Sequence, residues 1–130
     1  MFFKRNKEEV NILNRLYPKV VYNGVAYILE GIPYYIKNQK IYKFSSMRAW
    51  YSWYLVPSIV HGLPDLPTGG TLGFRDGSLI QNAKDGRIYL ISDAKRRLIT
   101  VPLKDLGFDI SDVEEVSDAE IEFHTEGEDI

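Results

Sequence analysis

A short pattern of strands and turns occurs twice in this chain, and no other feature constrains the fold as strongly. The first copy comprises residues 27–31 and 34–36 (YILEG and YYI), and the second comprises residues 89–93 and 97–99 (YLISD and RLI). Each half also closes on a Thr-x-Gly sequence, at Thr68 and at Thr125. Repeated units of this kind stack on one another and usually bind partners instead of catalysing reactions. The alternative is that two unrelated β-hairpins share a similar apolar pattern.

Composition indicates a globular protein without cysteine chemistry. Its 130 residues suit one compact domain or two small ones, and a hydrophobic fraction of 45% is enough for a core. The absence of cysteine excludes disulfides, a thiolate nucleophile and a cysteine-ligated metal. The opening residues, MFFKRNK, turn polar at once, so we expect no signal peptide and synthesis in a cytoplasm. The apolar runs are too short for a membrane span.

The net charge of −2 conceals opposite charges in the two halves. Residues 1–65 hold nine Lys or Arg against four Asp or Glu, whereas residues 66–130 hold seven against fourteen. Beyond Lys104 there are eleven carboxylates and no Lys or Arg. This acidic end is either simply solvated or directed at a basic partner, such as the basic half of another copy. Its charge argues against nucleic-acid binding by this part of the chain.

Residues 1–19 are expected to form an N-terminal arm. A short helix is predicted over residues 5–16, where Asn6 can act as its cap and Glu9 follows three residues later. Pro18 ends this helix. Such a helix docks either onto the core of its own chain or onto a partner.

Residues 20–70 are expected to form a first module, rich in aromatic residues. Its strands, rich in β-branched and aromatic residues, are separated by turn signals at Asn23-Gly24, at Gly31 and at Asn38-Gln39. Ser45 or Ser46 is then expected to cap a short helix over residues 47–55. Residues 56–70 are rich in Pro and Gly, which predicts an irregular connection.

Residues 71–130 are expected to form a second, acidic module. Two hairpins are predicted, one pairing residues 72–77 with 78–81 through Asp76-Gly77 and one turned near Asp93-Ala94. A short helix should end at Gly107, and the Ser-x-x-Glu sequence at Ser117 predicts a capped helix. The fold class that follows is α+β and β-rich, with two degenerate repeats of a β-hairpin plus a short helix behind an N-terminal helix.

Known catalytic and metal-binding patterns are missing from the sequence. Its two histidines, His61 and His124, have no partner at metal-ligand spacing, and His124 follows a predicted helix end, where a cation is favoured. There is no phosphate-binding loop, nucleophile elbow or zinc-protease motif. Asp76-Gly77 and Asp85-Gly86 indicate turns and do not form a calcium loop. We therefore predict no catalytic residue, no cofactor and no metal site, and a protein that is not an enzyme.

Aromatic residues are the strongest indication of a binding surface. Thirteen of the seventeen lie in residues 1–54, and a helix that carries four neighbouring rings must direct them to more than one side. Some of these rings are expected at a protein interface, where Trp and Tyr supply large contact areas, and the alternative is that most of them fill the core. The aromatic interface candidates are Tyr34, Tyr35, Trp50, Tyr51, Trp53 and Tyr54.

A basic triplet adds a second interface candidate. Lys95, Arg96 and Arg97 are adjacent at a predicted hairpin tip. They are either a solvated turn or a docking point for the acidic end of another module. Three basic residues are too few to indicate a nucleic-acid site.

The second half of the chain resembles a small tandem module of bacteriophage virion proteins, chiefly minor tail or connector components, and of the ends of some secreted bacterial surface proteins. The residues that carry the resemblance are 76–80 (DGSLI), 88–91 (IYLI), 95–99 (KRRLI), 106–108 (LGF), 117–121 (SDAEI) and Gly127. The first half resembles it only as a diverged copy, with Pro33-Tyr34-Tyr35 in place of the Lys-Arg element. The resemblance implies adhesion or assembly without catalytic residues, and the polar start of the chain favours the phage group.

The expected function is therefore that of a virion component in the tail, neck or baseplate of a tailed phage. Its partners would be other virion proteins, with copies of itself in a symmetric assembly as one case, and neither nucleic acid nor a membrane. One alternative is a module that binds a cell-wall or host-surface glycan, with Trp50, Trp53 and nearby tyrosines as its stacking platform. Another is a small acidic inhibitor or regulatory protein.

Overall fold

The computed structural model describes residues 24–130, which form two compact units. Unit 1 contains residues up to 43 together with 56–70, and unit 2 contains residues 44–55 together with 71–130. The boundary at residue 70 coincides with the predicted one. Residues 44–55, however, belong to unit 2, whereas the prediction placed them in the first module. The helix predicted over residues 5–16 lies outside the described residues.

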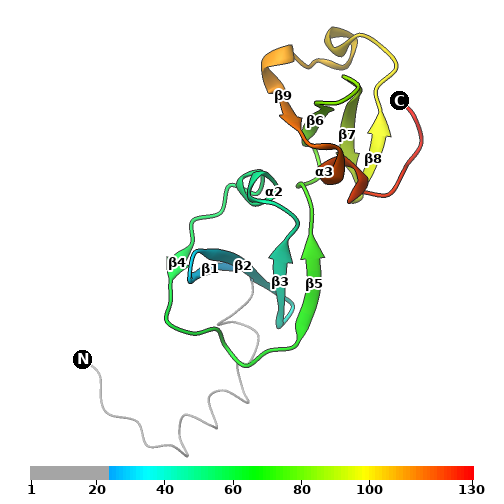
Figure 1. The fold of residues 1–130 in the computed structure, drawn as a ribbon. Helices are drawn as coiled ribbons and strands as arrows, with labels where there is room; N and C mark the ends of the chain where they lie inside the picture. Colours follow the sequence, from blue (N-terminus) through cyan, green and yellow to red (C-terminus); the bar gives the residue numbers. More distant parts are fainter. Residues whose placement is uncertain (1–23) are drawn as a thin grey trace, which may run out of the picture. The chain divides into compact units, whose positions relative to one another are not determined.

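Unit 1 is built on an antiparallel meander of three strands, β1 (Val25–Leu29), β2 (Ile32–Lys37) and β3 (Lys40–Phe44). The strand order of its sheet is β4-β1-β2-β3-β5, in which β4 (Ser58–Ile59) runs parallel to β1 and β5 (Thr68–Leu72) lies beside β3 (Figure 1). The two meander turns, Glu30-Gly31 and Asn38-Gln39, have positive φ at both residues. These are tight two-residue turns whose twist matches that of the paired strands.

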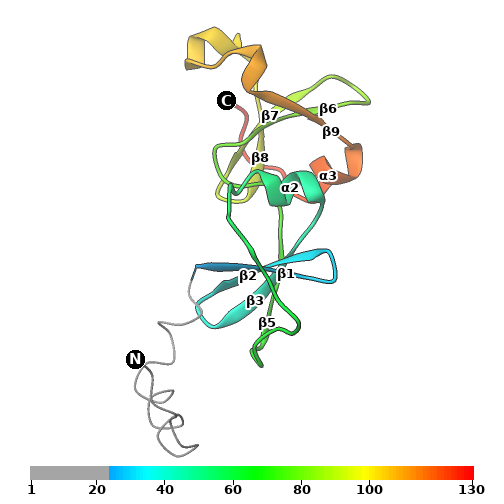
Figure 2. The same ribbon diagram turned by 90° about the vertical axis from the view of Figure 1, so that its left-hand side faces the viewer.

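Unit 2 contains a second sheet with the order β8-β7-β6-β9. Figure 2 shows its strands, which are β6 (Leu79–Asn82), β7 (Ile88–Ser92), β8 (Lys95–Leu98) and β9 (Val113–Val116). The first three form an antiparallel meander, and β9 pairs in parallel with β6. The helical elements of unit 2 are α2 (Met47–Tyr51), α3 (Asp118–Glu122) and the 3-10 turns Leu103–Leu106 and Ile110–Asp112.

The core of unit 2 lies between its sheet and the two short helices. Ile80 and Ile91 are completely buried, and α2 contributes Ala49 to the same cluster. The other members of the cluster are Phe74, Tyr89, Val116 and Ile121, with Leu98 packed against them. This core explains why α2 belongs to unit 2, because withdrawing Ala49 would expose the isoleucines to water.

The predicted fold class, α+β and β-rich, is confirmed, but two local predictions are wrong. The hairpin predicted across Asp76-Gly77 does not form, because β5 lies in the first sheet and β6 in the second. A local turn signal cannot reveal which sheet its flanking strands will join. The helix predicted over residues 47–55 already ends at Tyr51, where Ser52 is the C-cap residue.

The predicted repeat alignment is not confirmed, although the two sheets share a topology. In each, three antiparallel strands are followed by a strand that pairs in parallel with the first. A final segment then lies beside the third strand, namely β5 beside β3 and residues 125–130 beside β8. In this correspondence β1 matches β6 and β2 matches β7. The predicted alignment instead paired residues 27–31 with 89–93, which is displaced by one strand.

Candidate binding groove

A groove of about 560 Å³ lies in unit 2. It lies where the end of α2, the chain before β6, and the residues around the start of β9 meet. Its lining residues are Tyr51, Ser52, Tyr54, Arg75, Asp76, Gly77, Ser78, Leu79, Ile80, Phe108, Asp112 and Glu114. The volume falls within the range of pockets that hold small ligands or single side chains.

Two tyrosine rings are exposed at this groove. Tyr51 is 63% exposed and Tyr54 is 85% exposed, whereas Trp50, on the same helix, is only 5% exposed. Tyr54 has a φ of 51°, a left-handed conformation that is unfavourable for a bulky side chain. The fold therefore places this ring outward at a conformational cost, which is typical of functional positions.

The two tryptophans lie differently from the predicted stacking platform. Trp50 is buried and meets Phe44 edge-to-face, with the ring centroids 5.1 Å apart. The indole nitrogen of Trp53, a half-buried residue, donates a hydrogen bond of 2.9 Å to the carbonyl of Gly73. Burial therefore argues against Trp50 as an interface residue. The indole nitrogen of Trp53 is already hydrogen-bonded within the chain. Tyr34 and Tyr35 are half-buried in β2 of unit 1.

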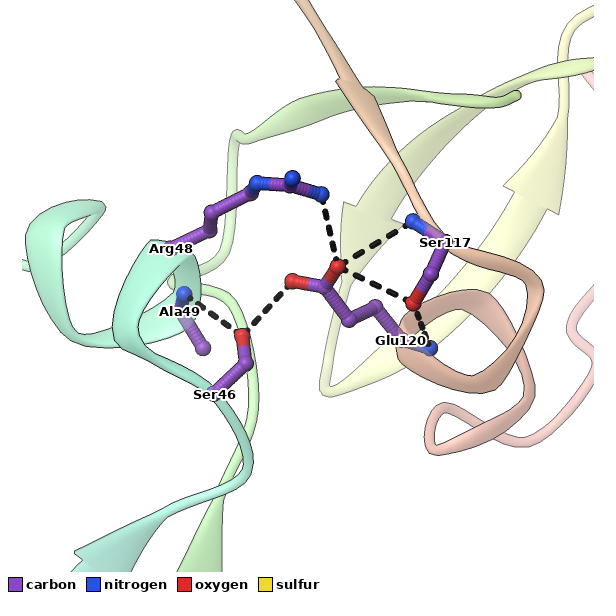
Figure 3. A network of polar contacts seen from close by, with 5 residues as sticks. All are labelled: Ser46, Arg48, Ala49, Ser117 and Glu120. Atoms are coloured by element: carbon purple, nitrogen blue, oxygen red, sulfur yellow. Dashed lines mark hydrogen bonds and ion pairs between the residues drawn. The ribbon is translucent and has the colours of Figure 1, made fainter.

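A polar network anchors the helix that carries Tyr51 (Figure 3). The Ser46 hydroxyl accepts a hydrogen bond from the Ala49 backbone and donates one of 2.7 Å to Glu120 Oε2. Arg48 forms an ion pair of 2.9 Å with Glu120 Oε1. Glu120 also closes the predicted capping box of α3, through Ser117. One carboxylate thus joins the N-terminal ends of both short helices.

The pKa of Glu120 lies below its ordinary value of 4.5. Burial on its own would raise this pKa, but the hydrogen bonds from Ser46 and Ser117 and the charge of Arg48 outweigh it. The unfolded chain binds the proton more tightly, so the stability that Glu120 contributes is present above pH 4.5 and is lost as the pH falls through the folded pKa.

Two adjacent serines provide a matched test of this anchor. Replacing Ser46 with alanine removes the N-cap and one bond to Glu120, so we expect the free energy of unfolding to fall by about 1–2 kcal/mol. Ser45→Ala should not lower it, because the Ser45 hydroxyl is buried without a partner and its removal breaks no hydrogen bond. Both tryptophans lie in unit 2, so their fluorescence during urea unfolding measures these changes. Equal losses in the two variants would contradict the assignment of Ser46 as the cap.

Three carboxylates and one guanidinium give the groove a net negative charge. They belong to Asp76, Asp112, Glu114 and Arg75. Asp76 accepts a hydrogen bond of 2.9 Å from the Ala94 backbone, and Asp112 accepts one of 2.9 Å from the Asp109 backbone. These two carboxylates are held in place by turns, whereas Glu114 is exposed on β9. The acidic and aromatic features, which the sequence placed in separate halves, meet at one groove.

His124 is a structural residue that sequence analysis did not identify. It is 2% exposed, its Nε2 accepts a hydrogen bond of 3.0 Å from the Phe74 backbone, and its Nδ1 lies 2.7 Å from the Ala94 carbonyl. These partners assign a neutral ring with the proton on Nδ1. The residue follows Ile121, a core residue of α3, at a spacing of three, and this spacing was the available signal for an inward side chain.

The expectation that a cation is favoured at His124 is wrong. Burial lowers the pKa of His124 below its ordinary value of 6.5, and the charge of Arg96 lowers it further. The bond to Ala94 and the charge of Asp76 act in the opposite direction but are outweighed. A proton on Nε2 would also break the bond from Phe74.

A pH dependence of stability follows from this lowered pKa. The unfolded chain takes up the proton first, so the contribution of His124 is complete above pH 6.5 and declines as the pH falls below that value. For a single proton the decline cannot exceed about 1.4 kcal/mol per pH unit. Urea unfolding at intervals between pH 7.5 and 5.5 measures it. Stability that is constant over this range would contradict the neutral ring.

Two residues of the basic triplet form hydrogen bonds within the chain. Arg96 donates hydrogen bonds to the carbonyls of Ile121 and His124, and Arg97 donates one of 3.0 Å to the carbonyl of Glu128. The structure thus places two of the three predicted docking residues against residues 121–128. Lys95 remains exposed, beside a second, shallower pocket of about 460 Å³.

Two features are absent from the part of the chain that the structure describes, residues 24–130. No group of three or more potential metal-ligating side chains is found there. Within the same residues, no helix has the length and apolar character needed to cross a membrane.

Comparisons with family models, with curated proteins and with solved structures found no match to this chain. A functional proposal therefore rests on the groove and on the sequence pattern.

Proposed function

We propose that this chain is a non-enzymatic binding protein that attaches to neighbouring proteins, as a structural component of a tailed-phage virion. The observation that supports attachment is the pair of exposed tyrosines at the groove of unit 2. Tyrosine is enriched at protein interfaces because its rigid ring supplies contact area and its hydroxyl a hydrogen bond. The virion setting rests on the sequence resemblance of residues 76–127.

The form of attachment is tested by light scattering of the purified chain at low and at high salt. A ring or filament that dissociates in salt would support self-assembly through the basic and acidic parts of the chain. A monomer in both conditions would exclude self-assembly and leave a different protein as the partner.

The virion setting needs a separate experiment. Phage particles released by the strain that encodes the chain can be banded by density and examined by mass spectrometry. The chain should be present in the banded particles at a constant ratio to the major capsid protein. If it stays behind in the cell lysate, the virion assignment is wrong, while a binding role remains open.

Glycan binding is the second candidate function, and the same exposed tyrosines favour it. A sugar ring stacks on an aromatic face, and Tyr51 and Tyr54 are the rings at the groove that could offer one. Of the platform expected from the sequence, Trp50 is buried and Trp53 is half-buried, which leaves its tyrosines. A glycan module would bind as an isolated monomer.

A further inference from the structure

We infer that the groove binds an arginine side chain presented by a partner protein. This inference rests on the proposed attachment to a neighbouring protein and names the chemistry of the contact. It is carried by three features of the groove, namely exposed rings, a net negative charge and an apolar wall. The experiments distinguish a failure of arginine binding from a failure of the proposed attachment.

The exposed rings suit the flat face of a guanidinium group. Arginine stacks on aromatic rings through both its charge and its planar shape, and the interaction strengthens when water is excluded. Tyr51 and Tyr54 are the most exposed rings of unit 2 and line the same groove. The backbone at Tyr54 is in the left-handed region, and its ring is 85% exposed.

The charge of the lining favours a cation over a neutral sugar. The lining contains three carboxylates and one guanidinium, that of Arg75, so the groove has a formal charge of −2. Glu114 is the carboxylate best suited to bind, because it is exposed and, among the contacts described for this unit, it has no ion-pair partner. A carboxylate can accept two parallel N–H bonds from arginine, a geometry that lysine cannot reproduce.

An apolar wall completes the fit. Leu79 and Phe108 line the same groove as these carboxylates. The aliphatic stem of arginine packs on apolar surface while its head remains among polar groups. A neutral peptide or a sugar would leave the carboxylates without a charged partner. An arginine side chain can stack on the rings, pair with the carboxylates and pack its stem on the apolar wall.

The binding test uses four probes and the full chain. The first probe is an acetylated, amidated glycine-rich peptide with two arginines, and its matched peptides carry lysine or citrulline at the same positions. The fourth probe is a trisaccharide of N-acetylglucosamine. Titration calorimetry at low and at moderate salt measures each affinity. We expect the arginine peptide to bind best, the citrulline peptide about tenfold or more weakly, and added salt to weaken the arginine peptide.

Adjacent glutamates of β9 provide the matched variants for the charge. Successive side chains of a strand point to opposite faces, so Glu114 lines the groove while Glu115 does not. Glu114→Gln should weaken the arginine peptide about fivefold or more, and Glu115→Gln, with the same change in net charge, should leave it unchanged. Equal effects of the two variants would overturn the inference.

A glycine substitution tests the ring without risking the fold. Tyr54→Gly removes the ring and suits the left-handed backbone, so the melting temperature should hold or rise while arginine binding falls about fivefold. Tyr54→Ala removes the ring but keeps the unfavourable conformation, so it should bind equally poorly without the gain in stability.

Three further outcomes would overturn the inference. They are equal binding of the arginine and citrulline peptides, no binding of any peptide at millimolar concentration, and trisaccharide binding that Glu114→Gln leaves intact, which would assign the groove to a glycan. Self-assembly or presence in virions that survives both Glu114→Gln and Tyr54→Gly would keep the proposed function and remove the groove from it.

Discussion

Replacing His124 with alanine should lower the free energy of unfolding of unit 2 by about 4 kcal/mol. The imidazole satisfies the Phe74 N–H and the Ala94 carbonyl, and it is almost completely buried. Alanine leaves a cavity and removes the partner of the buried Phe74 N–H, which costs about 1–3 kcal/mol, as well as the partner of the carbonyl of Ala94, an exposed residue. The loss is measured by urea unfolding followed through the fluorescence of Trp50 and Trp53.

The control for this prediction is His61, which is exposed in unit 1. His61→Ala should change the unfolding of unit 2 by no more than about 0.5 kcal/mol. A loss below about 1 kcal/mol in His124→Ala would mean that water replaces the ring at both partners. The decline of stability below pH 6.5 should also be absent from this variant if it folds.

Replacing Gly73 with alanine should cost about 3 kcal/mol, although it adds a single methyl group. An added Cβ would lie inside van der Waals contact of the His124 ring and 2.8 Å from Phe123 Cδ2. The imidazole ring cannot move away from the new methyl group without breaking its hydrogen bonds to Phe74 and Ala94. Relieving the steric clash therefore costs additional free energy. The same fluorescence measurement in urea detects the loss.

Gly62 provides the control for the Gly73 substitution. At Gly62 an added Cβ would meet no atom within 4 Å, and the backbone there is not left-handed. Gly62→Ala should therefore be neutral or slightly stabilising, because alanine restricts the unfolded chain. If both alanine variants were neutral, the close approach of Gly73 to His124 would be wrong.

Local chemistry predicted the elements whose cause lies in a few adjacent residues. The turns at Asn38-Gln39 and Asp93-Ala94 form with positive φ at both positions, as a tight hairpin requires. The 3-10 turn that begins at Leu103 stops at Gly107 in the left-handed conformation, and the capping box between Ser117 and Glu120 closes. Each of these depends on hydrogen bonds within about four residues.

Predictions that needed distant partners were less successful. The chain before β6 reads as one arm of a hairpin, yet β5 joins the other sheet beside β3. Helical periodicity placed several rings on α2, but only packing decided which of its residues face inward. Ala49 packs in the cluster with the isoleucines and Trp50 is buried against Phe44, whereas Tyr51 is exposed. Periodicity assigns residues to faces of a helix and leaves open which face the core will cover.

The sequence by itself determined the β-rich class, the tight turns and the helix caps, because these follow from φ preferences and from short-range hydrogen bonds. The tertiary structure alone decided that the acidic residues Asp76, Asp112 and Glu114 meet Tyr51 and Tyr54 at one groove. These residues come from segments up to about sixty positions apart, and burial of a shared core brings them together. For the same reason His124, an isolated histidine in the sequence, became the residue that joins three segments of unit 2.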